Sequence, residues 1–226
     1  MDNVRKHFEE EANEYNNIII NLIPYYNEML EALISSIQLN TSDTFSLLDL
    51  GCGPGTITKL VLKKYPKAKV TCVDIASNMI ELAEKTLGEY KDIEFINKDF
   101  YNLKLSKKYD VVLSSLALHH LLNNDDKKAF YNKIYGWLNN KGSFFNADNV
   151  IASGKRLDDT YMEKWIEYMN RNVSMEEINS KWLVKYADED KPAILFNQLL
   201  WLKDIGFKEV DVIWKYYNFS VYGGYK

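Results

Sequence analysis

Cysteine and histidine are scarce in this chain of 226 residues, which holds two cysteines and three histidines. Cys52 falls in a glycine-rich turn and Cys72 in an expected interior strand, so the sequence offers neither a disulfide framework nor the ligand spacing of a zinc cluster. We therefore expect reduced thiols and no bound metal. Apolar runs of membrane-spanning length are also lacking, and the segment 1–14 is charged rather than signal-like. These absences predict a cytoplasmic protein without membrane contact.

Positive charge is not in excess either, because the formal net charge is -4. A dedicated nucleic-acid binder usually carries a basic stripe, so this class of protein is disfavoured. Alternating strand-like and helix-like segments, with 46% hydrophobic residues, predict a single α/β domain over 1–226. Within this domain we expect an N-terminal helical arm over 1–42 and a helical insertion, or lid, over 150–191.

Residues 47–56 form the most informative stretch. An apolar run ends near Asp49, glycines follow, and apolar residues then recur at helical spacing, which predicts a strand, a tight turn and a helix. The glycines are Gly51, Gly53 and Gly55. Glycine permits positive φ and a close approach of the backbone to a ligand. A dinucleotide turn needs a small residue where Thr56 stands, and Pro54 removes a backbone N–H, so a nicotinamide oxidoreductase is disfavoured.

From Asp49 onward, the Asp-x-Gly-x-Gly-x-Gly run resembles motif I of the class I S-adenosylmethionine-dependent methyltransferases. The resemblance implies S-adenosylmethionine as the cofactor, bound at Asp49, at the three glycines and at Cys52 between them. It also implies a Rossmann-like methyltransferase fold of class α/β. Such a fold has a seven-stranded, mostly parallel sheet of order 3-2-1-4-5-7-6 with the last strand antiparallel. The N-terminal helices would precede the sheet, and the helical insertion would follow strand 5.

A second segment fits the same family. Residues 69–74 form a β-branched run that closes on Asp74. An acidic side chain at the end of a second strand can accept hydrogen bonds from both hydroxyls of an adenosine ribose. The alternative is an acid at the start of the following helix. The resemblance also assigns Ile75 and Met79 to the cofactor site, with Met79 against the adenine.

The third and fourth strands add further cofactor candidates. After an expected strand over 93–96, the resemblance implies that Asp99 accepts from the adenine amine and that Phe100 packs on the ring. The fourth strand ends in Ser115 and Leu116, at the edge where α/β sheets bind ligands. Both residues therefore join the predicted cofactor site.

The candidates for catalysis are His119, His120 and Asp148. The histidines lie in a segment similar to the one that follows the fourth strand in many small methyltransferases. Adjacent helical residues point about 100° apart, so we expect at most one histidine to face the pocket. Asp148 ends a fifth strand over 143–148. A buried structural histidine and a solvated loop carboxylate are the alternatives. A base is needed only if the accepting atom must lose a proton, and Tyr15 of the arm, a candidate pocket residue, could also serve.

Apolar spacing predicts one arm helix over 2–16 and another that starts near Pro24. In the insertion we expect two amphipathic stripes, which pack, line the pocket or form a homodimer contact. The stripes comprise Tyr161, Trp165, Tyr168 and Met169, then Met175, Ile178, Trp182 and Leu183. The chain should close with a helix from Pro192 to Gly206 and two antiparallel strands joined by a turn at 215–216.

These features predict an enzyme that transfers a methyl group from S-adenosylmethionine to a small-molecule acceptor. Residues 23–26 and 175–178 resemble segments of the bacterial enzymes that modify the wobble uridine of tRNA with carboxy-S-adenosylmethionine. Those enzymes hold the extra carboxylate with an arginine, whereas no arginine stands near Lys181 and Trp182, although Lys181 offers a point charge. The alternatives are a tRNA-modifying carboxymethyltransferase, with nucleic acid as its partner, and a non-catalytic cofactor-binding protein.

Overall fold

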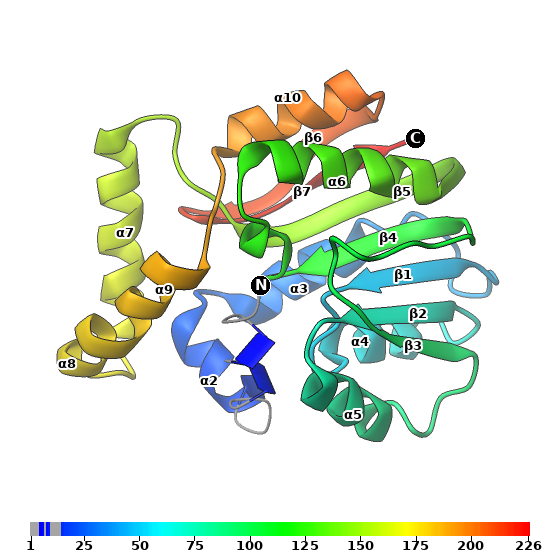
Figure 1. Ribbon diagram of the computed structural model, residues 1–226, viewed down its shortest axis with the longest axis horizontal. Coiled ribbons are helices and arrows are strands. Elements are labelled where there is room, and N and C mark those ends of the chain that lie inside the picture. The colour runs from blue at the N-terminus through cyan, green and yellow to red at the C-terminus, as the bar shows by residue number, and fades with distance from the viewer. Residues whose placement is uncertain (1–4, 7, 10–14) are drawn as a thin grey trace.

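The computed structural model describes residues 5–6, 8–9 and 15–226, without the side chains of 15–17 (Figure 1). Strands form one sheet in the order β3-β2-β1-β4-β5-β7-β6. They are β1 (Ser46–Leu50), β2 (Lys69–Asp74), β3 (Ile93–Asn97), β4 (Tyr109–Ser115), β5 (Leu138–Asn149), β6 (Lys208–Tyr216) and β7 (Phe219–Tyr225). The strand β7 runs antiparallel to both of its neighbours, and the remaining pairs are parallel. The predicted sheet order and antiparallel last strand are confirmed.

Helices cover both faces of the sheet. They are α3 (Tyr26–Ser35), α4 (Thr56–Lys64), α5 (Ser77–Thr86), α6 (Asn124–Trp137) and α10 (Leu195–Ile205). Leu47 and Leu48 of β1 are both fully buried, but Leu47 joins the core on the side of α3 and α4, whereas Leu48 joins the core on the side of α6 and α10. Figure 1 shows these helix pairs on opposite faces. Burial on both faces explains the continuous apolar run of β1 and leaves the carboxyl ends of the strands for ligands.

The arm and the insertion lie together at one end of the sheet (Figure 1). Their helices are α2 (Tyr15–Leu22), α7 (Lys155–Met169), α8 (Met175–Glu177) and α9 (Leu183–Glu189), with a π-helical turn over Ile178–Trp182. Trp165 donates from Nε1 to the Leu22 carbonyl oxygen at 2.7 Å, and the Tyr168 hydroxyl donates to the Ile20 carbonyl oxygen at 2.9 Å. The Trp165 and Phe219 rings are 5.7 Å apart. These contacts fasten the insertion to the arm and to β7.

Within the described ranges, no helix has both the length and the apolar character needed to span a membrane. The helix expected over 2–16 falls largely outside the described residues, of which 5–6 and 8–9 are helical, and α2 begins at Tyr15. One predicted helix boundary differs from the structure. The last helix does not begin at Pro192, because Ile194 forms a parallel bridge with Ile151 before α10 starts. A backbone bridge of this kind depends on tertiary contact, which the local sequence does not reveal.

The C-terminal strand pair is present, but its turn is displaced from the predicted position. Gly206 ends α10 as expected, with a φ of 117° and an N–H that donates to the Leu202 carbonyl oxygen at 3.2 Å. Residues 215–216 belong to β6, and the turn falls at Tyr217-Asn218. Tyr217 has a φ of 46°. Tyrosine is not a residue type that indicates a left-handed backbone, so the turn could not be located at this position from the residue types alone.

Candidate active site

The turn between β1 and α4 has positive φ at each of its glycines. The φ angles are 73° at Gly51, 51° at Gly53 and 85° at Gly55. A Cβ at Gly51 would lie 2.2 Å from the Cβ of Ala117, and a Cβ at Gly55 would lie 2.9 Å from the Leu87 side chain. At Gly53, by contrast, a Cβ would meet no described atom within 4 Å. Packing therefore demands glycine at Gly51 and Gly55, while Gly53 borders open space.

Asp74 ends β2 directly beside this turn. Its Oδ2 accepts from the Gly53 N–H at 2.8 Å, its Oδ1 accepts from the Ala76 N–H at 2.9 Å, and the residue is 7% exposed. Burial raises the pKa of Asp74, and these backbone donors act against the rise. A carboxylate oxygen can accept two hydrogen bonds, so each oxygen can take one more. Asp74 can thus hold the turn and accept two hydroxyl groups at the same time.

A cavity of about 50 Å³, here named the turn cavity, lies beside the glycine turn and the ends of β2 and β4. The predicted cofactor residues that line it are Gly51, Gly53, Asp74, Ile75, Met79, Phe100, Ser115 and Leu116. The rest of the lining comes from Phe8, Ala117 and His120. The hydroxyl oxygen of Ser115 is buried and has no hydrogen-bond partner among the described residues. An unpaired buried hydroxyl of this kind is ready to bind a ligand.

Other predicted cofactor residues do not line the turn cavity as the described residues define it. These are Asp49, Cys52, Gly55 and Asp99. Asp49 is fully buried and accepts from the Thr58 hydroxyl at 2.7 Å, which ties β1 to α4. Burial raises the pKa of Asp49 to about 6. Cys52 is a buried free thiol, and Asp99 accepts a backbone N–H two residues further on at 2.8 Å. The side chain of Tyr15 lies outside the part of the chain that the structure describes.

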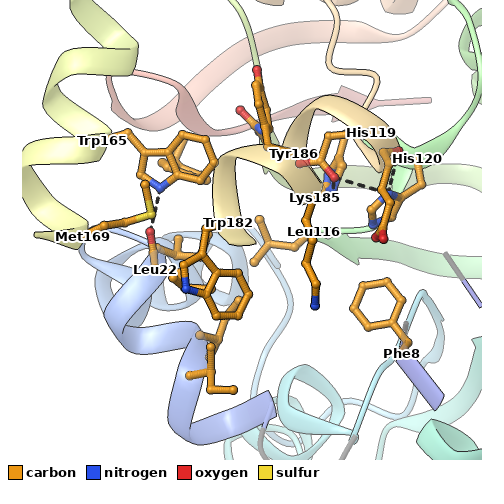
Figure 2. A pocket seen from close by; sticks show the side chains of 17 residues that line it. Phe8, Leu22, Leu116, His119, His120, Trp165, Met169, Trp182, Lys185 and Tyr186 are labelled. Carbon is orange, nitrogen blue, oxygen red and sulfur yellow. Dashed lines mark hydrogen bonds and ion pairs between the residues drawn. The ribbon is translucent and has the colours of Figure 1, made fainter. Parts of the chain in front are cut away.

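A second cavity of about 130 Å³, here named the apolar cavity, lies between the arm, the insertion and the ends of β4 and β5. Its apolar walls include Ile18, Ile19, Leu22, Ile23, Trp165, Met169, Trp182 and Phe219. Figure 2 shows Trp165 and Trp182 on one side of the cavity and His119 and His120 at its other end. Residues of both predicted insertion stripes therefore form pocket wall.

The two cavities adjoin each other. Phe8, Leu116 and His120 line both of them. The Phe8 ring lies edge-on to the His120 ring, with centroids 5.6 Å apart. Leu116 has a φ of 50°, and its N–H donates to the Ala147 carbonyl oxygen at 2.8 Å. The left-handed backbone costs a residue with a Cβ about 1 kcal/mol, and here it occurs at the junction of the two cavities.

His119 and His120 form a cluster with two carboxylates at the polar end of the apolar cavity. His119 is hydrogen-bonded through Nδ1 to Asp148, and its Nε2 lies 3.4 Å from Asp190 Oδ1. His120 Nδ1 lies 3.5 Å from the same oxygen, and the imidazole rings are 4.1 Å apart. The structure thus brings the three predicted catalytic residues together and adds Asp190, which sequence reasoning missed.

One expectation about these histidines is wrong. Both of them line the apolar cavity, whereas at most one was expected to face it. They lie in a short 3-10 helix over Leu118–His120 with their ring centroids 4.1 Å apart, so both rings border the same cavity. Asp190 follows the end of α9, far along the chain from His119. No motif marks Asp190 in the sequence, and only the path of the insertion brings it to the histidines.

Burial and neighbouring charges shift the pKa values of the two imidazoles in opposite directions. Burial acts to lower the pKa of His119, but the carboxylates of Asp190 and Asp148 outweigh it and raise that pKa to about 10. Burial and the charge of His119 lower the pKa of His120 to about 3. Burial acts to raise the pKa of Asp190, but the two imidazoles hold it below its usual range. At neutral pH the His119 ring is therefore a cation between two carboxylates, and the His120 ring is neutral.

Buried polar groups hold the cluster in place. Lys127, which is 1% exposed, donates from Nζ to the carbonyl oxygen of His119 at 3.4 Å and also to that of Leu121. Burial lowers the pKa of Lys127 to about 8. Asn146 donates from Nδ2 to Asp148 Oδ2 at 3.0 Å. These contacts fix the backbone of the histidine turn and the orientation of the Asp148 carboxylate.

The sheet order and the glycine turn with Asp74 beside it define a Rossmann-like protein whose candidate ligand site lies at the carboxyl edge of its sheet. Residues 47–142 match the family model described as a methyltransferase domain. The chain is 24% identical over 196 residues to malonyl-[acyl-carrier protein] O-methyltransferase 1 of Ilyobacter polytropus, a match that covers 83% of this chain and 69% of that protein.

Two further comparisons cover nearly the whole chain. It is 26% identical over 222 residues to the carboxy-S-adenosyl-L-methionine synthase of Nautilia profundicola, which covers 96% of this chain and 93% of that protein. An O-methyltransferase family protein from Burkholderia thailandensis shares the fold, with a TM-score of 0.66 at 15% identity over 95% of this chain and 59% of the other. Residues 47–142 are thus a methyltransferase domain, and these comparisons support a class I S-adenosylmethionine-dependent methyltransferase.

Proposed function

We propose that this protein transfers the methyl group of S-adenosylmethionine to a small-molecule acceptor held in the apolar cavity. The observation that carries the proposal is the junction of the two cavities at Leu116 and His120. A cofactor in the turn cavity and an acceptor in the apolar cavity would meet at these two side chains. The arm and the insertion would cover both molecules there, which keeps water away from the reacting atoms.

The residues of the turn cavity suit the parts of the cofactor. Asp74 presents two carboxylate oxygens to the ribose hydroxyls, and Gly53 leaves the space that a Cβ would fill. Met79 and Phe100, which are 1% and 6% exposed, offer apolar surfaces to the adenine. The Ser115 hydroxyl, unpaired within the described ranges, can bind a polar group of the cofactor. These observations support the assignment of cofactor binding to this cavity.

When bound, the cofactor supplies a sulfonium whose methyl group passes to a nucleophilic atom of the acceptor. The task of the chain is to hold and align the acceptor. His120 lines both cavities, so its imidazole can contact the accepting group. His119 and Asp148 form the hydrogen-bonded pair behind it. We assign His120 to contact with the reactants, and His119 and Asp148 to its positioning.

The residues that line the apolar cavity indicate which kind of acceptor it would hold. Trp165, Met169 and Trp182 provide apolar surface, which suits a ring or a short alkyl chain. Asn149 lines the same cavity, and its Oδ1 is buried without a hydrogen-bond partner in the described part of the chain. This oxygen can accept a hydrogen bond from a hydroxyl or amine of the acceptor. The I. polytropus relative is an O-methyltransferase by name, which supports oxygen as the accepting atom.

Label transfer distinguishes the classes of acceptor. The protein is incubated with methyl-labelled S-adenosylmethionine and, separately, with the small-molecule, RNA and protein fractions of a bacterial extract. We expect label in the small-molecule fraction, and a loss of about tenfold or more in Trp182→Ala, since an aromatic contact is worth about 1 kcal/mol beyond its buried area. The control Phe196→Ala removes a ring that is 61% exposed on α10 and should keep full activity.

Each other outcome contradicts part of the proposal. Label confined to the RNA or protein fraction would exclude a small-molecule acceptor. Cofactor binding without label in any fraction would exclude catalysis and leave a non-catalytic cofactor-binding protein. Calorimetric titration of Trp182→Ala with S-adenosylmethionine checks that this variant is folded. Trp182 lines the apolar cavity but not the turn cavity as the described residues define it, so the folded variant should still bind the cofactor.

A second candidate function is the synthesis or use of carboxy-S-adenosylmethionine. The likeness to the N. profundicola synthase spans 96% of this chain, and Lys185 brings a cation to the apolar cavity. Figure 2 shows the Lys185 side chain between Trp182 and Phe8. Parallel titrations with the ordinary and the carboxylated cofactor separate the two candidates. Tighter binding of the carboxylated form that is lost in Lys185→Met would favour the second candidate, and equal or weaker binding would remove it.

We also propose that the protein works in the cytoplasm. Its two cysteines, Cys52 and Cys72, are both buried free thiols, which is the state that a reducing compartment maintains. Fractionation of the source cells followed by immunoblotting tests this location. We expect the protein in the soluble cytoplasmic fraction, and recovery from the membrane fraction or the medium would contradict the proposal.

A further inference from the structure

We propose that Nε2 of His119, Nδ1 of His120 and Oδ1 of Asp190 bind a divalent transition-metal ion, zinc by preference, at the polar end of the apolar cavity. These three ligand atoms lie within 4.8 Å of one another. Imidazole nitrogen and carboxylate oxygen are ligands that zinc uses in catalytic sites, where three protein groups leave a fourth position for water or substrate.

The distances between the ligand atoms suit a single ion. Asp190 Oδ1 lies 3.4 Å from His119 Nε2 and 3.5 Å from His120 Nδ1. Two ligand atoms that are each about 2.1 Å from a tetrahedral ion lie about 3.4 Å apart. The Asp190 oxygen therefore already stands at the spacing of a shared ion from both histidines. One nitrogen from each imidazole and one Asp190 oxygen lie within 4.8 Å of one another.

The surroundings of His119 are those of a metal-binding histidine. Its Nδ1 is hydrogen-bonded to the Asp148 carboxylate, which directs Nε2 toward Asp190. A histidine that binds a metal through one nitrogen almost always donates from the other to a carboxylate, carbonyl or water. Asp148 is itself held by the Asn146 side chain at 3.0 Å and by the Asn149 N–H at 2.9 Å. This second layer of contacts fixes the ring before any ion arrives.

Burial and access also suit such a site. The histidines are each 6% exposed, and the Asp190 side chain is 19% exposed. All three residues line the apolar cavity, so an open position on the ion would face the acceptor rather than the protein interior. In the metal-free state, His119 Nε2 pairs with Asp190, and His120 Nδ1 lies 3.3 Å from the Glu189 carbonyl oxygen as well as 3.5 Å from Asp190 Oδ1. Metal binding would replace the protons on both of these nitrogens.

The role of the ion in methyl transfer rests on the proposed function, whereas metal binding itself does not. An acceptor hydroxyl bound to a divalent ion loses its proton more readily, and the proton leaves to solvent. The acceptor oxygen then forms its bond to the methyl carbon while the carbon–sulfur bond breaks, and the electron pair of that bond returns to sulfur. The products are the methyl ether, S-adenosylhomocysteine and one proton. The site therefore favours acceptors with a hydroxyl beside their apolar body.

Cobalt provides the test, because protein-bound Co²⁺ absorbs visible light where aqueous Co²⁺ absorbs weakly. The full chain is freed of metal with a chelator and titrated with Co²⁺, and Zn²⁺ is then added. We expect one Co²⁺ per chain, displaced by Zn²⁺. Asp190→Asn and His120→Gln should each weaken Co²⁺ binding by at least about tenfold, and Asp148→Asn by about tenfold through His119. The matched control Asp188→Asn alters an exposed carboxylate close to Asp190 in the sequence and should leave the titration unchanged.

Two results would overturn the metal site. One is a wild-type protein that shows no stoichiometric Co²⁺ or Zn²⁺ binding, and the other is unchanged Co²⁺ affinity in Asp190→Asn. Circular dichroism checks the fold of every variant, and Asp190→Asn carries the test if the substitution of the more deeply buried His120 unfolds the chain. S-adenosylmethionine binding is measured on the same samples without metal. Loss of metal binding with intact cofactor binding would reject this inference and leave the proposed methyl transfer standing.

Discussion

Replacement of Asp74 by alanine should abolish most of the affinity for S-adenosylmethionine. The carboxylate accepts the N–H groups of Gly53 and Ala76 at 2.8 and 2.9 Å, and we propose that it also accepts both ribose hydroxyls. A hydrogen bond to a charged group contributes about 1.5–3 kcal/mol. Loss of one ribose bond would weaken binding about tenfold, and loss of both about a hundredfold or more. Release of the Gly53 N–H would loosen the turn and add to the effect.

Calorimetry with S-adenosylmethionine and S-adenosylhomocysteine measures this change, and urea unfolding shows whether Asp74→Ala still folds. The matched control is Asp43→Ala. The Asp43 carboxylate likewise accepts a backbone N–H, that of Asn40 at 2.9 Å, but it lies before β1 and away from the turn cavity. The control should bind the cofactor as the wild type does. Folded Asp74→Ala with unchanged affinity for both ligands would refute the assignment of the ribose site.

Three further predictions follow from the same residues. Gly53→Leu should still fold, with about 1 kcal/mol less free energy of unfolding because of the left-handed backbone. Its affinity for the cofactor in calorimetry should fall at least about tenfold, because the leucine side chain would enter the turn cavity. Normal affinity would place the cofactor elsewhere. The pKa of Asp49 is about 6 in the folded protein, against an ordinary value of 3.8. Between these pH values the native state therefore binds more protons than the unfolded state. The free energy of unfolding should therefore fall by about 2 kcal/mol as the pH rises from 4 to 6, and Asp49→Asn should lack this fall in urea titrations. The same slope in both proteins would show that Asp49 is not its source. Trp165→Phe removes the hydrogen bond to the Leu22 carbonyl oxygen, so we expect the free energy of unfolding to fall by about 1 kcal/mol. An unchanged free energy of unfolding would show that this bond is unimportant.

Individual strands of the sheet were predictable because their signals are local, whereas the order of the strands was implied by the family resemblance. Residues 69–74 read as a strand from their β-branched run, and β2 has these bounds. The apolar run at Leu47-Leu48 and the glycines after it indicated a buried strand followed by a turn, and the carboxylate of Asp74 was placed beside that turn from its position in the chain. A site feature that depends on a single strand end or a single turn is formed by consecutive residues, so it can be predicted from the local sequence.

The rest of the candidate site depends on contacts between distant segments. Asp190 meets the histidines only because the insertion folds back over the sheet, and the Trp165 hydrogen bond to the arm depends on the same path. Neither contact has a sequence period or motif. The expectation of no bound metal considered only spacing along the chain, and such spacing does not show that Asp190, which follows α9, lies near the histidines after β4. Tertiary structure, rather than propensity, decides such positions.

The central claim is that the turn cavity binds S-adenosylmethionine, and calorimetric titration of the purified chain tests it most directly. S-adenosylmethionine, S-adenosylhomocysteine, carboxy-S-adenosylmethionine and NADH are titrated in parallel. We predict micromolar binding of the first two, with one molecule bound per chain, and no binding of NADH. Binding of NADH alone, or of none of the four, would contradict the account of the glycine turn and of the site built on it.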